Sequence, residues 1–209
     1  MPGTRPGRTE FAVTVLDTSA AERKAALRRE ILARRDALPP AKRQAAAEAI
    51  AARPFPLSIA AGSIVSGFSP LKSEINPLPL MRKLAAAGAG LALPVVAGRG
   101  KPLTMRSYAF GQPLNEGVWG IREPKPDAPE VDPDILIVPL AAFDRRGNRI
   151  GYGAGYYDMT IHRLRSIKSV VAVGIAYAAQ EVPEVPVTAR DERLDLVLTE
   201  RDVIDFRKA

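Results

Sequence analysis

A nearly unbroken apolar run, DILIVPL at Asp134–Leu140, restricts the fold of this 209-residue chain more than any other segment. A strand without alternating polar residues is typical of the centre of a parallel sheet that is covered on both faces. Shorter apolar segments before and after it alternate with segments of helical character, which indicates an α/β protein. We therefore predict a three-layer sandwich with a largely parallel mixed sheet and helices on both faces.

The other elements are predicted from the spacing of apolar residues and from the positions of Pro and Gly. Helices are expected at residues 19–38, 40–52, 76–87 and 156–167, and strands at residues 63–68, 91–96, 103–108, 170–177, 194–198 and 203–206. Ser19 and Glu22 fit a capping box at the start of the first helix. Residues 111–133 are predicted to form one long loop. We find no repeat and no long linker, so residues 19–209 are expected to form a single domain after a disordered extension, residues 1–18.

The composition excludes several kinds of site. The chain has no Cys and a single His, His162, so disulfides, thiolate metal sites, a cysteine nucleophile and His-rich metal clusters are excluded. Any bound metal would have oxygen ligands, which favours a hard ion such as Mg²⁺. No run of about 18 apolar residues occurs, so no membrane span is expected. Residues 1–18 lack the apolar core of a secretory signal, and a cytoplasmic location is therefore expected.

The positive charge is concentrated near the start of the chain. The net charge is +7, and residues 1–53 hold 11 Lys and Arg against 6 Asp and Glu, which is +5. Such an arm favours an anionic partner: nucleic acid, nucleotide phosphates or a polyanionic small molecule. Lys24 and Arg28 lie four residues apart, on one face of the predicted helix, and could hold a triphosphate. The alternative is an ordinary solvated helix face.

The glycine-rich block from Asp144 to Asp158 carries the strongest local signal. It follows the apolar strand and precedes a helix, where ligands bind in open α/β sheets. Gly151, Gly153 and Gly155 would let backbone amides approach phosphate oxygens, and the helix adds its positive N-terminus. The spacing is neither the dinucleotide fingerprint nor a Walker A loop. The block therefore predicts a different phosphate-binding loop, with Arg149 as a fixed cation beside it.

Other polar and aromatic residues are weaker candidates when taken singly. Glu74 follows the first strand and could accept hydrogen bonds from a pterin ring, or could be an exposed loop residue. Asp158 and Asp191 are candidate Mg²⁺ ligands that we expect to lie close together and unpaired, although Asp191 could also belong to a surface turn. Trp119 could cover an aromatic ring or only anchor its loop. His162 is expected to be peripheral.

Together these segments resemble the 5-formyltetrahydrofolate cyclo-ligase family, also called 5,10-methenyltetrahydrofolate synthetase. The resemblance covers about residues 19–200. It rests on six segments in a fixed order: KAALR at Lys24–Arg28, SEINP around Glu74, WGIREP around Trp119, FDRRGNRIGYGAGYYD ending at Asp158, GIAYAAQ at Gly174–Gln180 and DERLDLVLTE from Asp191. The block ending at Asp158 is the most specific of these segments.

The resemblance implies roles for particular residues. The implied ATP-binding residues are Lys24, Arg28, Arg149, Ile150, Gly151, Tyr152, Gly153, Ala154, Gly155, Tyr156 and Tyr157. The implied substrate-binding residues are Glu74, Trp119, Tyr152, Gly153, Ala154, Gly155 and Tyr156. Arg149 and Tyr152 would be catalytic, and Asp158 and Asp191 would hold Mg²⁺. One departure is Ala154, where many relatives carry Lys or Arg, so that Arg149 and the basic arm would have to neutralise the phosphate charge.

The activity that the resemblance implies is the ATP-dependent conversion of 5-formyltetrahydrofolate to 5,10-methenyltetrahydrofolate. The N5-formyl oxygen would attack the γ-phosphate of MgATP, N10 would close the ring, and ADP and phosphate would be released. Such phosphoryl transfer needs positioning and charge neutralisation rather than a nucleophilic side chain. A monomer without a nucleic-acid or membrane partner is expected.

Two other functions remain open from the sequence. A homologue could keep the fold but carry out another phosphoryl transfer or sense a ligand. A basic nucleic-acid-binding module is disfavoured, because residues 19–53 contain no aromatic residue on which a base could stack.

Overall fold

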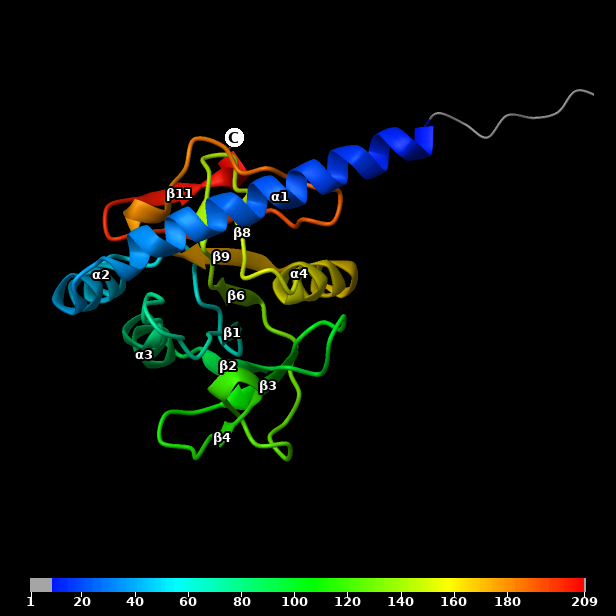
Figure 1. The fold of residues 1–209 in the computed structure, drawn as a ribbon. Coiled ribbons are helices and arrows are strands. Elements are labelled where there is room, and N and C mark those ends of the chain that lie inside the picture. Colours follow the sequence, from blue (N-terminus) through cyan, green and yellow to red (C-terminus); the bar gives the residue numbers. More distant parts are fainter. Residues whose placement is uncertain (1–8, 209) are drawn as a thin grey trace, which may run out of the picture.

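A seven-stranded sheet forms the centre of the computed structural model, which describes residues 9–208 and, for residues 9–19, the backbone alone. The strand order is β11-β10-β9-β6-β1-β2-β3 (Figure 1). The strands are β1 Ile64–Ser66, β2 Gly90–Val95, β3 Thr104–Tyr108, β6 Ile135–Val138, β9 Val171–Ile175, β10 Leu196–Leu198 and β11 Val203–Asp205. The five inner strands are parallel, and the two edge strands β3 and β11 run antiparallel to their neighbours. The predicted mixed, mostly parallel sheet is confirmed.

The apolar run of the sequence forms the middle strand, β6. All four residues of β6 are buried, and the strand pairs with β1 on one side and with β9 on the other. Ile135 and Ile137 belong to one hydrophobic cluster and Leu136 and Val138 to another, on opposite faces of the sheet. The run is unbroken because neither face of this strand reaches water.

Helices cover both faces of the sheet, as predicted. The helices α2 (Pro40–Ala52) and α3 (Leu78–Ala86) pack on one face, to which they contribute Ile50, Leu80 and Met81. The helix α4 (Tyr156–Ile167) packs on the opposite face through Ile161 and Leu164. Figure 1 shows helices on both sides of the sheet. A separate apolar core lies between the sheet and the helices on each side.

The first helix, α1 (Thr9–Asp36), lies across one end of the sheet rather than on a face. Figure 1 shows it passing over the region between α2 and α4. Ile31 is fully buried against Ala141, Ala142 and Ile150, which follow the carboxyl end of β6. The helix also contacts η2 (Ala178–Gln180), just beyond β9. One helix therefore closes the edge at which the parallel strands end.

The predicted start of the first helix is wrong. α1 begins at Thr9, so that Ser19 and Glu22 lie inside the helix and form no capping box. The helix continues upstream because no Pro or Gly interrupts residues 9–18. Of the extension predicted to be disordered, residues 1–8 lie outside the described residues, and residues 9–18 form the first turns of α1.

Two predicted loops contain short hairpins. Residues 111–133 hold a small sheet of β4 (Asn115–Glu116) and β5 (Arg122–Glu123), joined by the 3-10 turn η1 (Val118–Gly120). The glycine-rich block holds β7 (Ala142–Phe143) and β8 (Arg149–Ile150), also paired antiparallel. Strands of two residues give too short an apolar pattern to be predicted from the sequence.

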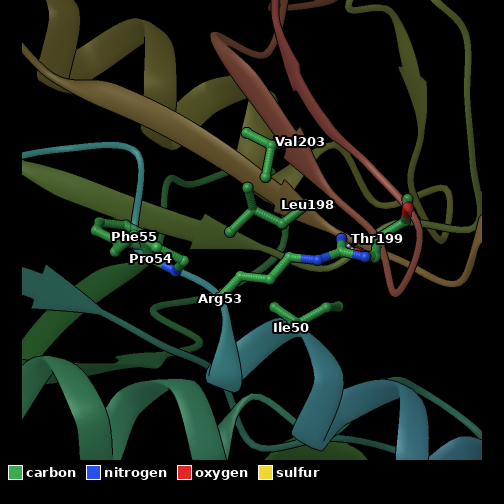
Figure 2. A pocket seen from close by; sticks show the side chains of 7 residues that line it. All are labelled: Ile50, Arg53, Pro54, Phe55, Leu198, Thr199 and Val203. Carbon is green, nitrogen blue, oxygen red and sulfur yellow. Dashed lines mark hydrogen bonds between the residues drawn. The ribbon is translucent and has the colours of Figure 1, made fainter.

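Arg53 joins α2 to the far edge of the sheet. Its guanidinium donates hydrogen bonds to the carbonyl oxygens of Thr199, at 2.8 Å, and Glu200, in the turn between β10 and β11. Its stem lies among Ile50, Phe55, Leu198 and other apolar side chains (Figure 2), with a free volume of about 10 Å³, which is too small for a ligand. Arg53 is therefore part of the framework rather than of a binding site.

Replacing Arg53 with Met should reduce the free energy of unfolding by about 1–3 kcal/mol, because two partly buried carbonyl groups lose their donors while the apolar stem is kept. Urea unfolding followed by circular dichroism measures the change. The matched control is Arg201→Met, since the Arg201 side chain is exposed and lies 3.9 Å from its nearest carboxylate. Equal stability of the two variants would contradict the role assigned to Arg53.

Candidate functional site

A cavity of about 620 Å³ opens at the carboxyl edge of the sheet. Its walls come from α1, from the segments that follow β1, β2 and β6, from the β4–β5 hairpin and from the glycine-rich block. Ten of the residues predicted as site residues line it: Glu74, Trp119, Arg149, Gly151, Tyr152, Ala154, Gly155, Tyr156, Tyr157 and Asp158. The volume is typical of a small-molecule site, and the position is the one expected for open α/β sheets.

Five predicted site residues do not line this cavity: Lys24, Arg28, Ile150, Gly153 and Asp191. Ile150 is buried in the cluster beneath α1, so that its side chain supports the block and can offer a ligand only its backbone. The others lie beside the cavity, where α1 meets the end of the glycine-rich block. The two groups of predicted residues are thus adjacent but distinct.

The buried carboxylate of Asp144 organises the first half of the glycine-rich block. It accepts hydrogen bonds from the backbone amides of Arg146 and Asn148, at 2.9 and 3.0 Å, and from the amide of Val185 at 3.0 Å. These bonds fix the turn between β7 and β8. The chain therefore enters the phosphate-loop candidate from a rigid turn.

Positive backbone φ angles explain two of the glycines in the second half. Gly153 has φ of 104°, and Gly155, the residue before α4, has φ of 68°. Side chains other than glycine rarely adopt these angles, so the loop needs glycine at both positions. A Cβ atom on Gly153 would also lie 3.6 Å from the guanidinium of Arg28. The loop therefore presents its backbone to a cation on α1.

Lys24 and Arg28 are not a solvated face. Lys24 forms an ion pair with Asp191, and its side chain is only 13% exposed. The Nε atom of Arg28 donates a hydrogen bond of 2.7 Å to the carbonyl oxygen of Gly151, and burial lowers the pKa of Arg28. Arg28 therefore faces the glycine-rich block and Lys24 faces Asp191, while the predicted contacts of both cations with phosphate remain predictions.

Arg149 is a buried cation that ties the block to the segment around Glu192. Its Nη2 atom donates to Asp158 at 2.8 Å, and its Nη1 atom donates to the carbonyl oxygen of Glu192. Asp158 also accepts a hydrogen bond of 3.1 Å from the amide of Glu192. These two hydrogen bonds, to two different acceptors, fix the guanidinium beside the cavity.

The expectation of two unpaired carboxylates is wrong. Asp158 is paired with Arg149, and Asp191 is paired with Lys24 and accepts hydrogen bonds from Thr188. Each carboxylate gains a cation because the surroundings are rich in Lys and Arg. The bond between Asp158 and the amide of Glu192 nevertheless places Asp158 beside the residue that follows Asp191. The predicted proximity of the two carboxylate groups themselves stays a prediction.

The chemistry of these two carboxylates fits Mg²⁺. No group of three or more Asp, Glu or His side chains gathers among the described residues, but a metal bound with nucleotide phosphates needs only one or two carboxylates. The hydrogen bonds named above use one oxygen of Asp158 and one of Asp191. The second oxygen of each carboxylate accepts no hydrogen bond from the residues that the structure describes, so it can accept an ion.

Glu74 is a partly buried carboxylate inside the cavity rather than an exposed loop residue. It accepts a 2.7 Å hydrogen bond from the amide of Leu71. Burial raises the pKa of Glu74, while the hydroxyl of Tyr152, the amide of Leu71 and the charge of Arg35 oppose the rise. A carboxylate of this kind can accept N–H groups of a ring that enters the cavity.

Trp119 is held at the cavity in an uncommon backbone conformation. Its φ of 59° is left-handed, and the residue is 65% exposed. Its ring lies 6.2 Å from the ring of Tyr156, at a tilt of 54°. Because such a conformation costs free energy in a bulky residue, an exposed aromatic ring kept this way at a cavity is a candidate ligand contact.

Three features of the site were missed from the sequence. Arg35 is buried in the cavity wall, and Lys72, also left-handed with φ of 53°, lines the same cavity. The spacing of seven residues between Arg28 and Arg35 could have indicated Arg35, because it places both on one helix face. The hydroxyl of Tyr157 is buried and has no hydrogen-bond partner among the described residues.

His162 pairs with Glu192 at an exposed position and is peripheral, as predicted.

Comparisons with known proteins agree with this geometry. The model of the 5-formyltetrahydrofolate cyclo-ligase family matches residues 20–200. The 5-formyltetrahydrofolate cyclo-ligase of Mycolicibacterium smegmatis is 34% identical over 193 residues, which are 88% of this chain and 97% of the relative. That of Escherichia coli K12 is 34% identical over 184 residues, which are 83% and 98% of the two chains.

A solved structure extends the agreement to the fold. The 5,10-methenyltetrahydrofolate synthetase of Aquifex aeolicus, determined by NMR, matches with a TM-score of 0.73 and 29% identity. The match covers 89% of this chain and 94% of that one.

Within residues 9–208, no helix has the length and apolar character needed to cross a bilayer.

These matches confirm the resemblance predicted from the six sequence segments. The family model spans most of the chain, and the relatives are matched over nearly their whole length. The chain therefore belongs to the 5-formyltetrahydrofolate cyclo-ligase family of enzymes.

Proposed function

We propose that the chain catalyses the ATP-dependent closure of 5-formyltetrahydrofolate to 5,10-methenyltetrahydrofolate, with release of ADP and phosphate. The observation that carries this proposal is one cavity lined both by the glycine-rich block and by Glu74. A phosphate-binding loop and a ring-binding carboxylate thereby share one space, as phosphoryl transfer to a bound ring requires. The names of the similar proteins agree with this activity.

The folate ring would occupy the part of the cavity nearest Glu74. The carboxylate is hydrogen-bonded from one side by the amide of Leu71, which leaves acceptor capacity for N–H groups of the pterin. Trp119 and Tyr156 offer aromatic surface at the same cavity. The backbone from Tyr152 to Tyr156 would form the boundary between the folate and the nucleotide.

The ATP phosphates would lie on the glycine-rich block under α1. Arg28 projects from α1 onto this block, and Lys24 projects from the same helix toward Asp191. The helix α4 begins at Tyr156 with its amide groups at the positive end of the helix. Ala154 brings no charge of its own. The guanidinium of Arg28 next to Gly153 would supply from α1 the cation that many relatives carry at position 154.

The reaction consists of two transfers. The N5-formyl oxygen attacks the γ-phosphorus, the bond to the β-phosphate oxygen breaks, and ADP leaves. N10 then attacks the formyl carbon and loses its proton to the solvent, the C–O bond to phosphate breaks, and inorganic phosphate leaves with that oxygen. No side chain forms a covalent bond with the substrate. Arg149 would face the developing phosphate charge, and Tyr152 would orient the folate beside Glu74.

Asp158 and Asp191 would hold a magnesium ion through the carboxylate oxygens that their ion pairs leave unused. When bound, the ion neutralises charge on the β- and γ-phosphates. A monomer in the cytoplasm without a nucleic-acid partner remains the expectation.

The purified protein should convert 5-formyltetrahydrofolate only in the presence of MgATP, with one ADP formed per methenyl product, because the oxygen must be phosphorylated before it can leave. The appearance of methenyl absorbance and the release of ADP are measured in the same sample. Oligonucleotide binding at several salt concentrations serves as the test of a nucleic-acid module. Turnover without ATP, or equal activity on 10-formyltetrahydrofolate, would refute the proposed reaction.

Arg28→Ala should weaken ATP binding by about 1.5–3 kcal/mol, the contribution of a hydrogen bond to a charged group, and should leave folate binding largely unchanged. Calorimetric titration with each ligand separates the two effects. Arg29→Ala is the matched control, since Arg29 is the exposed neighbour on the same helix. If Arg28→Ala and Arg29→Ala bind ATP equally, Arg28 does not contact the nucleotide.

Asp158→Asn and Asp191→Asn should each raise the Mg²⁺ concentration for half-maximal activity, and their combined effect should be less than additive, because they serve one ion. Binding of Mn²⁺ in the presence of ATP, followed by electron paramagnetic resonance, gives a measure that does not depend on turnover. Asp132→Asn is the control for loss of an ion pair alone, because Asp132 pairs with Arg163 on the surface. Unchanged Mn²⁺ affinity in a variant would remove that residue from the metal site.

A further inference from the structure

Arg35 lines the cavity although it is only 4% exposed. Its Nε atom donates a hydrogen bond of 2.9 Å to the hydroxyl of Ser73, and its Nη1 atom donates to the hydroxyl of Tyr152. The guanidinium carbon also lies 5.7 Å from the centre of the Tyr152 ring. Arg35 thereby connects α1 with the segment after β1 and with the glycine-rich block.

A buried guanidinium is costly unless it is well paired, and the partners of Arg35 are mainly neutral. Its nearest carboxylate in an ion pair is that of Asp36, at 4.0 Å, and this side chain is largely exposed to water. The two direct hydrogen bonds go to uncharged hydroxyl groups. The positive charge of Arg35 is therefore directed into the cavity rather than neutralised within its wall.

The carboxylate that interacts with the positive charge of Arg35 across the cavity is that of Glu74. The hydroxyl of Tyr152 couples the two groups, since it accepts a hydrogen bond from Arg35, and its pKa is raised by burial and by the nearby charge of Glu74. Ser73, the other partner of Arg35, directly precedes Glu74 and is held in place by the hydroxyl of Tyr177 at 3.3 Å. The Ser73 hydroxyl itself donates to Asp36, so this contact of Arg35 fixes the backbone next to Glu74, while the contact with Tyr152 reaches toward the Glu74 side chain.

We propose that Arg35 is a positioning residue for the folate half of the cavity. It holds the Tyr152 hydroxyl against Glu74, and its charge faces the Glu74 carboxylate, which can then accept N–H groups of the bound ring. The identity of that ring rests on the proposed function, but the coupling of Arg35 to Glu74 does not. Arg35 acts through Tyr152 and Glu74 and does not itself contact the reacting atoms.

The causes that shift the pKa of Glu74 give the direction in which the loss of Arg35 should change that pKa. Burial raises the pKa of Glu74, while the hydroxyl of Tyr152, the amide of Leu71 and the charge of Arg35 lower it. Tyr157 and Tyr177 also face Glu74, and burial raises the pKa of each, so that they stay neutral. Removing Arg35 should therefore raise the pKa of Glu74 further. As the pH falls, the carboxylate form of Glu74, which accepts hydrogen bonds, should then be lost at a higher pH than in the unchanged protein.

The central experiment compares Arg35→Met with Arg34→Met. Arg34 is the adjacent residue on α1, is exposed and pairs only with Glu30 among the described residues, so its loss controls for the removal of one positive charge from the helix. The titration of the Glu74 carboxyl is followed by NMR in protein labelled with ¹³C-glutamate, and Glu74→Gln identifies its signal. This measurement uses the protein without ligands.

Arg35→Met should move the titration of Glu74 upward by about one pH unit, the usual effect of losing an opposite charge nearby, and Arg34→Met should not move it. The acid limb of kcat/KM for 5-formyltetrahydrofolate should move upward by the same amount. The KM for the folate should rise about tenfold at neutral pH, in proportion to the loss of one charged interaction, while the KM for ATP should change less than twofold.

Two further variants separate charge from position. Arg35→Lys should restore the titration of Glu74 but not the folate KM, since an ammonium group lacks the forked geometry that reaches both Ser73 and Tyr152. Full restoration of the KM by Lys would overturn the positioning role. Tyr152→Phe removes a single hydroxyl and tests the same link if Arg35→Met does not fold. It should also raise the pKa of Glu74 and the folate KM.

The outcomes distinguish this inference from the proposed function. A wild-type protein without turnover of 5-formyltetrahydrofolate would refute the proposed function, while the titration of Glu74 would still test the coupling. Conversely, a Glu74 titration that is equal in Arg35→Met and Arg34→Met would overturn the inference even in an active cyclo-ligase. An equal rise in KM for folate and ATP would overturn it as well, because it would indicate a general loss of structure.

Discussion

The packing of α1 across the carboxyl edge of the sheet is the constraint on which the whole site depends. Ile31, buried against Ala142 and Ile150, fixes the helix over the glycine-rich block. Once this apolar contact is formed, residues on the same side of the helix meet three different partners: Lys24 meets Asp191, Arg28 meets Gly151, and Arg35 meets Tyr152. Without α1, the cavity would lose one wall with Arg35, and the region beside the cavity would lose Lys24 and Arg28.

The position of these cations also gives each carboxylate of the site a positive charge beside it. Asp158, Asp191 and Glu74 each have a cation within the same small region, and every one of these cations is partly or fully buried. Charges that are shielded from water interact more strongly than those on the surface. The site is therefore prepared for a strongly charged ligand by side chains that already balance one another.

The sequence was sufficient for the central sheet and for much of the cavity lining. The unbroken apolar run predicted the position of β6 at the centre, and the glycine-rich block predicted the loop at its carboxyl edge, because both are local patterns. The family resemblance placed Glu74 and Trp119 beside that block. In contrast, the start of α1, the β4–β5 hairpin, Arg35 and the pairing of Asp158 and Asp191 were not foreseen. Contacts such as that between Lys24 and Asp191 join residues 167 positions apart, and no local pattern indicates which cation reaches which carboxylate.

The ion pair between Lys24 and Asp191 has a consequence for how the two ligands of the proposed reaction would bind. Each of the two side chains is the counter-ion of the other. A nucleotide that takes Lys24 for its phosphate would draw this cation away from Asp191 and leave the carboxylate uncompensated. A metal ion bound to the second oxygen of Asp191 would supply the missing positive charge. Metal and nucleotide would thus favour each other's binding by thermodynamic linkage, and the protein would bind the metal–nucleotide complex more tightly than the free nucleotide.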